Sequence, residues 1–307
     1  MQSSSDALTV VLGTGGTIAG TAARADDAVG YRSAQLGIAA LVGAVPPLAG
    51  VPLECEQVAQ LDSKDMDFAT WRRLALRVAH HLARAEVGGI VVTHGTDTLE
   101  ETAWFLQRVL APAKPVVLTA AMRPATALLA DGPQNLLDAV RVARERGARG
   151  VLAVLAGRVF VAAGLRKVHG YRLDAFDAGD AGALGVVEEG RLRRFRDWPG
   201  GSALGAGVVD VDEARWPRVE IVLNHAGADG DAVRALTTRG VDGIVVAGTG
   251  NGTVSAALER ALAEAEAAGV AVRRSTRCGA GLVRGDATLP SAVQARVELI
   301  LELLAAR

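Results

Sequence analysis

Several features that would assign a chain of 307 residues to a particular class are scarce in this one. Only two cysteines are present, Cys55 and Cys278, and two distant thiols supply neither a disulfide framework nor the spacing of a metal site. Lys and Arg number 33 against 34 Asp and Glu, so a net charge of −1 gives no reason to expect nucleic acid or a membrane surface as partner. No apolar run is long enough to span a bilayer. We therefore expect no metal, no cofactor of the metal-cluster type and no membrane anchor.

Aromatic residues are also few, at 4% of the chain, whereas half of the residues are hydrophobic and 36 are glycine. This composition supplies a large core and suits close packing of helices on a sheet. The first residues, MQSSSDALTVV, lack the basic and apolar regions of a signal peptide. We accordingly expect a cytoplasmic protein.

One stretch, VVLGTGGTIAG at Val10–Gly20, organises the rest of the chain. Its apolar start predicts a buried strand, and its glycines predict a sharp turn that carries the hydroxyls of Thr14 and Thr17. The carboxyl end of a parallel strand is where open α/β sheets bind ligands. A glycine turn with capping threonines is the ordinary alternative, and the spacing lacks the third glycine of a dinucleotide fingerprint.

A second stretch, GIVVTHGTDTLEE at Gly89–Glu101, repeats this arrangement. A buried strand at Ile90–Thr93 leads into the loop His94–Asp97, and Thr98 and Glu101 have the spacing of a capping box at a helix start. The loop thus brings a histidine, a threonine and a carboxylate to the same edge of the sheet as Thr17. Packing alone does not require this combination, so the two loops together predict a binding or catalytic site.

Strand and helix patterns alternate along most of the chain, which predicts an α/β fold with right-handed crossovers. We expect a larger N-terminal doubly wound domain with a mainly parallel sheet at residues 1–190. The Arg-, Pro- and Gly-rich stretch 191–215 is expected to be a linker, and a smaller α/β domain is expected at residues 216–307.

The two loop motifs identify a family resemblance. TGGTIAG at Thr14–Gly20 and THGTDT at Thr93–Thr98 resemble the two signature motifs of the bacterial-type L-asparaginase/glutaminase family. Four further motifs follow this family's order and spacing: DSKDM at Asp62–Met66, AAMRP at Ala120–Pro124, ADGPQNL at Ala130–Leu136 and GTGNG at Gly248–Gly252. The resemblance covers nearly the whole chain and implies an amidohydrolase that converts L-asparagine to L-aspartate and ammonia.

The resemblance also implies roles for individual residues. It makes Thr17 the nucleophile that forms an acyl-enzyme, Tyr31 the lid residue that assists proton transfer, and Thr96, Asp97 and Lys167 a second catalytic group. Substrate contacts are implied for Gly16, Asp62, Ser63, Lys64, Thr96, Asp97 and Ala121. Asn251 is implied to contact a neighbouring subunit's site, in a homotetramer built as a dimer of dimers. The family uses no cofactor, and the only small-molecule partner is an amino acid.

The histidines are interpreted as structural. His94 titrates in the neutral range when unperturbed, but the threonines and Lys167 already fill the catalytic roles. His80 and His81 are expected to be solvated residues on a helix, because the pattern offers them no metal partner.

Two departures from the family pattern bear on specificity. Lys64 stands where the family has a substrate-contacting glutamine, and the short segment Arg277–Pro290 lacks a glutamate that the family's secreted members carry. We therefore expect weak glutaminase activity. Three alternatives remain: the asparaginase-like subunit of a tRNA-dependent amidotransferase, a nucleotide-binding oxidoreductase that uses the glycine loop, and a catalytically silent ligand-binding oligomer.

Overall fold

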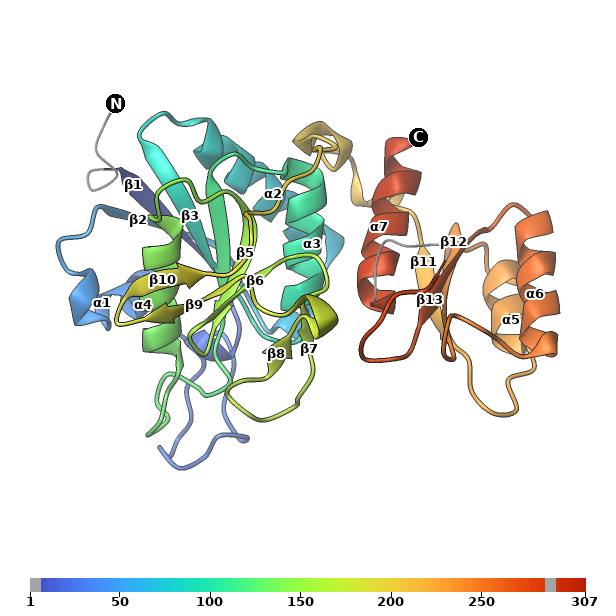
Figure 1. Cartoon of the computed structure of the whole chain (residues 1–307), viewed down its shortest axis with the longest axis horizontal. Helices are drawn as coiled ribbons and strands as arrows, with labels where there is room; N and C mark the ends of the chain where they lie inside the picture. Colours follow the sequence, from blue (N-terminus) through green and yellow to red (C-terminus); the bar gives the residue numbers. More distant parts are fainter. Residues whose placement is uncertain (1–6, 285–290) are drawn as a thin grey trace. The chain divides into compact units, whose positions relative to one another are not determined.

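The computed structural model describes residues 7–284 and 291–307, and it divides the chain into two compact units. Unit 1 runs to Ala178 and resumes at Gly182–Ala206, whereas unit 2 comprises Gly179–Ala181 and Gly207–Arg307 (Figure 1). The fold is of the α/β class, with a large mainly parallel sheet in the first unit and a smaller parallel sheet in the second.

Unit 1 is built on an eight-stranded sheet with the order β10-β9-β6-β5-β4-β3-β1-β2. Neighbouring strands from β2 to β5 pair in parallel, and β6, β9 and β10 add an antiparallel extension. The strands are β1 (Leu8–Gly15), β2 (Leu53–Leu61), β3 (Val87–Thr93), β4 (Pro115–Thr119), β5 (Gly150–Leu155), β6 (Arg158–Val161), β9 (Gly185–Glu188) and β10 (Arg191–Arg194). β1, β3, β4 and β5 are almost wholly buried, as expected of parallel strands covered on both faces.

Four helices cover this sheet: α1 (Ile38–Gly43), α2 (Phe68–Ala83), α3 (Leu99–Leu110) and α4 (Gly132–Ala143). α1 and α4 pack on the face that carries Val11, Val91 and Val117. α2 and α3 lie on the other face (Figure 1). Trp71 of α2 stacks there on Phe105 of α3, with ring centroids 4.8 Å apart. The connections β3–α3–β4 and β4–α4–β5 both lead to the next strand in the same direction along the sheet, but α3 and α4 lie on opposite faces. The two crossovers therefore have opposite handedness.

The expectation that every crossover is right-handed is therefore wrong for one of these two. The exception is the crossover through α4. This helix lies on the same face as α1, although the connections β1–α1–β2 and β4–α4–β5 run in opposite directions along the sheet. The chain runs from the end of β4 at Thr119 to Gly132 before this helix begins, and this long connection gives it the reach to change face.

The segment between the two expected domains begins with regular structure. β10, which lies in the stretch that the sequence analysis assigned to a linker, pairs with β9 in an antiparallel hairpin and forms one edge of the sheet. Its four residues are three arginines and one leucine, and charged residues are a common means of protecting an edge strand from further pairing. A separate two-stranded sheet is formed by β7 (Arg166–Lys167) and β8 (Phe176–Asp177).

Unit 2 has a three-stranded parallel sheet in the order β11-β12-β13. Its elements are β11 (Val219–Leu223), α5 (Asp231–Thr238), β12 (Gly243–Gly248), α6 (Ala256–Ala267), β13 (Ala271–Thr276) and α7 (Ala292–Ala305). α5 and α6 build a core against Val222, Ile244 and Val246. The connection after β12 holds the tight turn Thr249–Thr253, which is closed by two backbone hydrogen bonds.

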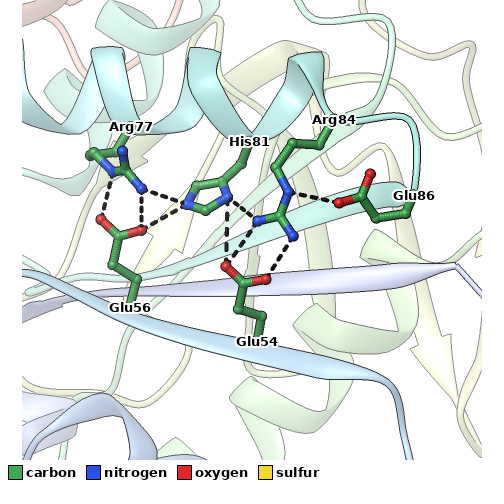
Figure 2. A network of polar contacts seen from close by, with 6 residues as sticks. All are labelled: Glu54, Glu56, Arg77, His81, Arg84 and Glu86. Atoms are coloured by element: carbon green, nitrogen blue, oxygen red, sulfur yellow. Dashed lines mark hydrogen bonds and ion pairs between the residues drawn. The ribbon is translucent and has the colours of Figure 1, made fainter.

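An ion-pair network fastens the end of α2 to the edge strand β2 (Figure 2). It comprises Glu54, Glu56, Arg77, His81, Arg84 and Glu86. Arg77 binds Glu56 with two hydrogen bonds of 2.6 and 2.8 Å, and Arg84 binds Glu54 with two of 2.9 and 2.8 Å. The Arg77 guanidinium is the main reason that the pKa of Glu56 falls to about 2.

His81 lies at the centre of this network and is almost fully buried. Arg84 Nη1 lies 2.9 Å from His81 Nδ1, and since a guanidinium only donates, Nδ1 accepts. Nε2 then carries the proton and donates to Glu56 Oε2 at 2.7 Å. The expectation of a solvated His81 is therefore wrong, because its carboxylate partner lies 25 positions earlier in the chain, where no helical pattern reveals it.

Candidate active site

The loop after β1 brings Thr17 to the carboxyl edge of the parallel strands. Gly15 and Gly16 adopt φ values of 103° and 82°, which residues with a side chain rarely adopt. A Cβ on Gly16 would lie 2.4 Å from the Cα of Gly95, so only glycine allows the loop after β3 to approach this closely. The two threonine-bearing loops are thus in direct contact, as the sequence predicted for parallel neighbours.

Thr17 and Tyr31 form the first pair of functional groups. Thr17 Oγ1 lies 2.6 Å from Tyr31 Oη, a short hydrogen bond in which either oxygen can be the donor. The tyrosine ring packs close to Gly20, where a Cβ would lie 2.9 Å from Cδ2 of the ring. Backbone hydrogen bonds between Thr21 and Arg32 bring the tyrosine's segment back to the loop of Thr17. The nearly buried threonine hydroxyl thus faces a phenol at hydrogen-bonding distance.

A second group forms where Lys167 meets the loop after β3. Lys167 Nζ donates to Thr96 Oγ1 at 2.8 Å and to Asp97 Oδ1 at 2.6 Å. Thr96 is buried, while the side chain of Asp97 is 50% exposed, so the carboxylate is open to a ligand from solvent. A lysine, a hydroxyl and a carboxylate from positions 70 residues apart in sequence therefore meet at one point.

The loop after β2 completes this edge of the sheet. Ser63 is buried, and its Oγ accepts a hydrogen bond of 3.1 Å from the backbone N–H of Asp97. The hydroxyl of Thr98 donates to the carbonyl of Ser63 at 2.8 Å rather than capping α3. The capping box expected at Thr98 is therefore wrong, because the hydroxyl joins two loops of the site instead. Asp62 precedes this serine and is half-buried.

Lys64 points into solvent beside two acidic residues. Its side chain is 61% exposed, and its Nζ lies 2.5 Å from Asp65 Oδ2 and 3.7 Å from Asp62 Oδ2. The hydrogen bond to Asp65 raises the pKa of Lys64, and Asp62 acts in the same direction. Lys64 is thus a fixed ammonium at the surface, close in sequence to the buried Ser63.

Ala121 lies buried between two backbone segments held by α4. The carboxylate of Asp131 accepts from the N–H groups of Met122 and Arg123, both at 2.9 Å. Asn135 Nδ2 donates to the carbonyl of Ala120 at 2.9 Å, and its Oδ1 accepts from Ala156 N–H at 3.0 Å. These bonds fix the chain on both sides of Ala121. Asp131 and Asn135 belong to the motif ADGPQNL, from which no role for either residue was predicted.

His94 is fully buried behind the loop, and its side-chain hydrogen bonds are made to residues other than Thr17 and Lys167. The carbonyl of Gly95 only accepts, so His94 Nδ1, which lies 2.7 Å from it, carries the ring proton and donates. In the neutral ring Nε2 then accepts from Thr102 Oγ1 at 3.0 Å, and Thr102 Oγ1 itself accepts from Trp71 Nε1 at 2.9 Å. Burial lowers the pKa of His94 to about 4, so the ring is neutral, in agreement with its structural interpretation.

Glu100 is a further carboxyl close to the second group, and no role was predicted for it from the sequence. It lies in the first turn of α3, and its Oε2 accepts the backbone N–H of Lys167 at 2.6 Å. Burial raises the pKa of Glu100 to about 7. Its position three residues after Asp97 could have indicated that it lies near the second group. Its partner is a backbone amide, however, and no pattern of side chains in the sequence reveals such a partner.

Asn251 lies in unit 2, in the turn Thr249–Thr253. Its Oδ1 accepts a hydrogen bond of 2.7 Å from the backbone N–H of Arg284. The expectation that it contacts a neighbouring subunit stays a prediction. The segment Arg277–Pro290, which was expected to lack a functional glutamate, lies partly outside the described residues, at 285–290.

The described residues contain no cluster of three or more His, Cys, Asp and Glu side chains arranged to hold a metal ion. Within residues 7–284 and 291–307, no helix has both the length and the apolar character needed to cross a membrane.

Comparisons with known proteins agree with the motifs. Residues 9–199 match the family described as Asparaginase, N-terminal, and residues 218–298 match the Glutaminase/Asparaginase C-terminal domain. The chain is 39% identical to the glutaminase-asparaginase of Pseudomonas fluorescens biotype A, over 89% of this chain and 76% of that protein. It is 37% identical to L-asparaginase 2 of Escherichia coli K12, over 92% and 81% respectively.

A solved structure is similar over nearly the whole chain. The crystal structure of a probable cytoplasmic L-asparaginase from Campylobacter jejuni superposes with a TM-score of 0.90 at 34% identity. The alignment covers 97% of this chain and 95% of that one. The similarity therefore extends over both units.

Proposed function

The chain belongs to the asparaginase/glutaminase family of amidohydrolases, and on that premise we propose that it hydrolyses L-asparagine to L-aspartate and ammonia through an acyl-enzyme on Thr17. One observation carries this proposal. Thr17 Oγ1 lies 2.6 Å from the Tyr31 hydroxyl, on a loop in direct contact with the loop that bears Thr96 and Asp97. A threonine hydroxyl is a weak nucleophile, and it needs such a neighbour to remove its proton.

In the proposed first step, Thr17 Oγ1 attacks the carbon of the substrate's side-chain amide. The hydroxyl proton passes through Tyr31 to the amide nitrogen, the C–N bond breaks, and ammonia leaves. In the second step, water attacks the resulting ester, the C–O bond to Thr17 breaks, and the threonine recovers its proton. Ala121, whose backbone Asp131 and Asn135 hold on both sides, is assigned to the amide pocket.

The second group is proposed to manage protons and to bind the amino-acid end of the substrate. Lys167 is assigned to exchange a proton with Thr96 during the reaction, because its Nζ lies 2.8 Å from Thr96 Oγ1. Asp97 Oδ1 receives the Lys167 bond, and its other oxygen is assigned to the α-ammonium. Ser63 is assigned to the α-carboxylate, with Gly16 and Asp62 lining this end of the site. Lys64, for which a substrate contact was expected, points into solvent beside Asp65.

Two coarser properties are also proposed. We expect a homotetramer built as a dimer of dimers, in which Asn251 contacts the site of a neighbouring subunit. Sedimentation at assay concentration tests this, and an active monomer contradicts it. We also propose a cytoplasmic location, which the solved Campylobacter jejuni protein's description supports. The Haemophilus influenzae relative, 36% identical, is described as periplasmic, so fractionation of the producing cell is the deciding measurement.

The experiment that tests the function is an ammonia-release assay with L-asparagine, L-glutamine and D-asparagine. We expect rapid release from L-asparagine and weak release from L-glutamine. No release from any free amino acid favours the amidotransferase subunit or a silent binding oligomer, which isothermal titration with L-asparagine then separates. Nicotinamide absorbance in the purified protein would favour the oxidoreductase.

A further inference from the structure

Glu100 links the backbone of Lys167 to the helix that follows Thr96 and Asp97. Lys167 lies in β7, a strand of two residues that pairs with β8 in a two-stranded sheet. On one side of this strand, Val168 N–H donates to the carbonyl of Ala175 at 2.7 Å. The N–H of Lys167 instead donates to Glu100 Oε2 at 2.6 Å. A carboxyl group on α3 thus takes the place that a further strand would occupy.

Both the backbone and the side chain of Lys167 are thus bound to the segment that runs from Thr96 to Glu100. Its backbone is bound to Glu100, and its Nζ is bound to Thr96 and Asp97, which lie four and three residues before Glu100. A lysine side chain has four rotatable bonds, so fixing its Nζ also requires fixing its backbone. The β7–β8 pair lies outside the eight-stranded sheet, and each of its two strands has only two residues.

We propose that Glu100 is a positioning residue, which holds the backbone of Lys167 at α3 so that the lysine Nζ stays on Thr96 and Asp97. This inference rests on the proposed function, because it assumes that Lys167 takes part in proton transfer. Glu100 itself contacts the lysine's backbone rather than the reacting atoms.

The electrostatics of Glu100 give this role a pH dependence. Burial raises the pKa of Glu100 to about 7, and Glu101 on the same helix acts in the same direction. The Lys167 N–H and the charges of Arg166 and Lys167 on β7 lower it. Below this pKa the carboxyl is neutral. Above it, the carboxylate is a stronger acceptor for the amide.

Two substitutions at position 100 separate positioning from charge. Glu100→Ala removes the acceptor, and we expect kcat for L-asparagine to fall at least tenfold while KM changes less than threefold, because Asp97 and Ser63 stay in place. Glu100→Gln keeps an oxygen acceptor but cannot ionise. We expect its kcat to stay within threefold of the parent at pH 7 and its pH profile to lack an inflection near pH 7.

Glu101→Gln is the matched control, since it removes the same charge from the same helix turn. It should keep a parental kcat and still show the inflection, moved to lower pH because Glu101 no longer raises the pKa of Glu100. In a Lys167→Met background, Glu100→Ala should cause no further loss, because a residue that acts through the lysine has nothing left to position. A further loss in that background, a kcat of Glu100→Ala within twofold of the parent, or a Gln variant as impaired as the Ala variant overturns the proposal.

A readout without catalysis separates failure of this inference from failure of the proposed function. The rate at which acetic anhydride modifies Lys167 is followed by peptide mass spectrometry. Release from Thr96 and Asp97 should raise this rate severalfold in Glu100→Ala but not in Glu101→Gln. If the parent releases no ammonia and the labelling still changes, the proposed function fails and the positioning stands. If the labelling stays the same in Glu100→Ala, the positioning role is refuted whatever the activity.

Discussion

Tyr31 Oη lies 2.6 Å from Thr17 Oγ1, although the two residues belong to different arms of the loop that follows β1. The tyrosine ring reaches this position because Gly20 has no side chain to displace it. At this separation the proton of one hydroxyl is hydrogen-bonded to the oxygen of the other. The pair is therefore suited to pass a proton between a nucleophile and a leaving group.

Thr17→Ala should leave the fold intact and reduce kcat for L-asparagine by at least about a thousandfold, because removal of a nucleophile removes the covalent step. Steady-state ammonia release and a thermal unfolding scan measure the two effects. Thr14→Val, at the end of β1 just before the loop of Thr17, is the control. Thr14 Oγ1 donates to the carbonyl of Thr93 at 3.0 Å, so its loss should lower the free energy of unfolding by about 1 kcal/mol. Activity of Thr17→Ala within tenfold of the parent would assign the nucleophile to another residue, with Thr96 next in line.

Thr96→Val and Lys167→Met should each reduce kcat strongly, and the double variant should be scarcely worse than the poorer single variant. The reason is that Lys167 Nζ and Thr96 Oγ1 are 2.8 Å apart and form one proton path, and groups that act as a unit are not additive. Kinetics of the four proteins of this cycle give the coupling. Losses that multiply independently would show that the two residues act in separate steps.

The contacts of the loops could be predicted from the sequence because their signals are local. Glycine next to threonine, directly after a buried apolar run, predicts a tight turn at the end of a strand, and parallel neighbours bring two such turns together. Gly16 and Gly95 meet in this way. Lys167 was located only through the family resemblance, since a lysine in an irregular segment has no local signal for a catalytic position.

The features that were missed depend on contacts between residues distant in sequence. His81 reads as one of two solvated histidines on a helix, but it is buried by Glu56 from the edge strand and by Arg84 (Figure 2). Thr98 has capping-box spacing, yet its hydroxyl donates to Ser63. In both cases a local preference was replaced by a tertiary hydrogen bond with a geometry that the sequence alone does not contain.

Acid should destabilise the protein through His94. In the folded state burial lowers the pKa of His94 to about 4, against an unperturbed value near 6.5. The unfolded chain therefore binds the proton more readily. The stability that comes from keeping His94 neutral is fully present above pH 6.5 and is lost as the pH falls toward 4. By linkage the loss between pH 7 and pH 4 is about 3 kcal/mol.

Denaturant unfolding of the parent and of His94→Gln at pH 7, 5.5 and 4 measures this contribution. Carboxylates that titrate in the same range act on both proteins and cancel in the difference. The free-energy cost of the substitution should shrink by about 3 kcal/mol from pH 7 to pH 4. A cost that is constant with pH would mean that His94 keeps an ordinary pKa despite its burial.

The last prediction concerns Lys64 and the choice between L-asparagine and L-glutamine. The ammonium is bound to Asp65 and points into solvent, although Ser63, its neighbour in sequence, is buried beside the backbone of Asp97. Movement toward the site would bring it near the substrate's own α-ammonium. Two like charges about 4 Å apart at an effective dielectric near 20 repel by roughly 4 kcal/mol before relaxation. Lys64 therefore stays outside, and the site lacks one polar contact at the amino-acid end of the substrate.

Lys64→Gln should supply that contact, because an amide carries no charge and can both donate and accept. We expect kcat/KM for L-glutamine to rise more than that for L-asparagine, since the longer substrate depends more on being held at its far end. A gain of one neutral hydrogen bond, about 1 kcal/mol, corresponds to a roughly fivefold change in the ratio of the two constants. Lys64→Met removes the charge without adding a hydrogen-bonding group, so it should leave the ratio near the parental value. The ratio in the three proteins decides the matter: an unchanged or lower ratio in Lys64→Gln, or an equal rise in Lys64→Met, would show that the missing contact does not set the selectivity.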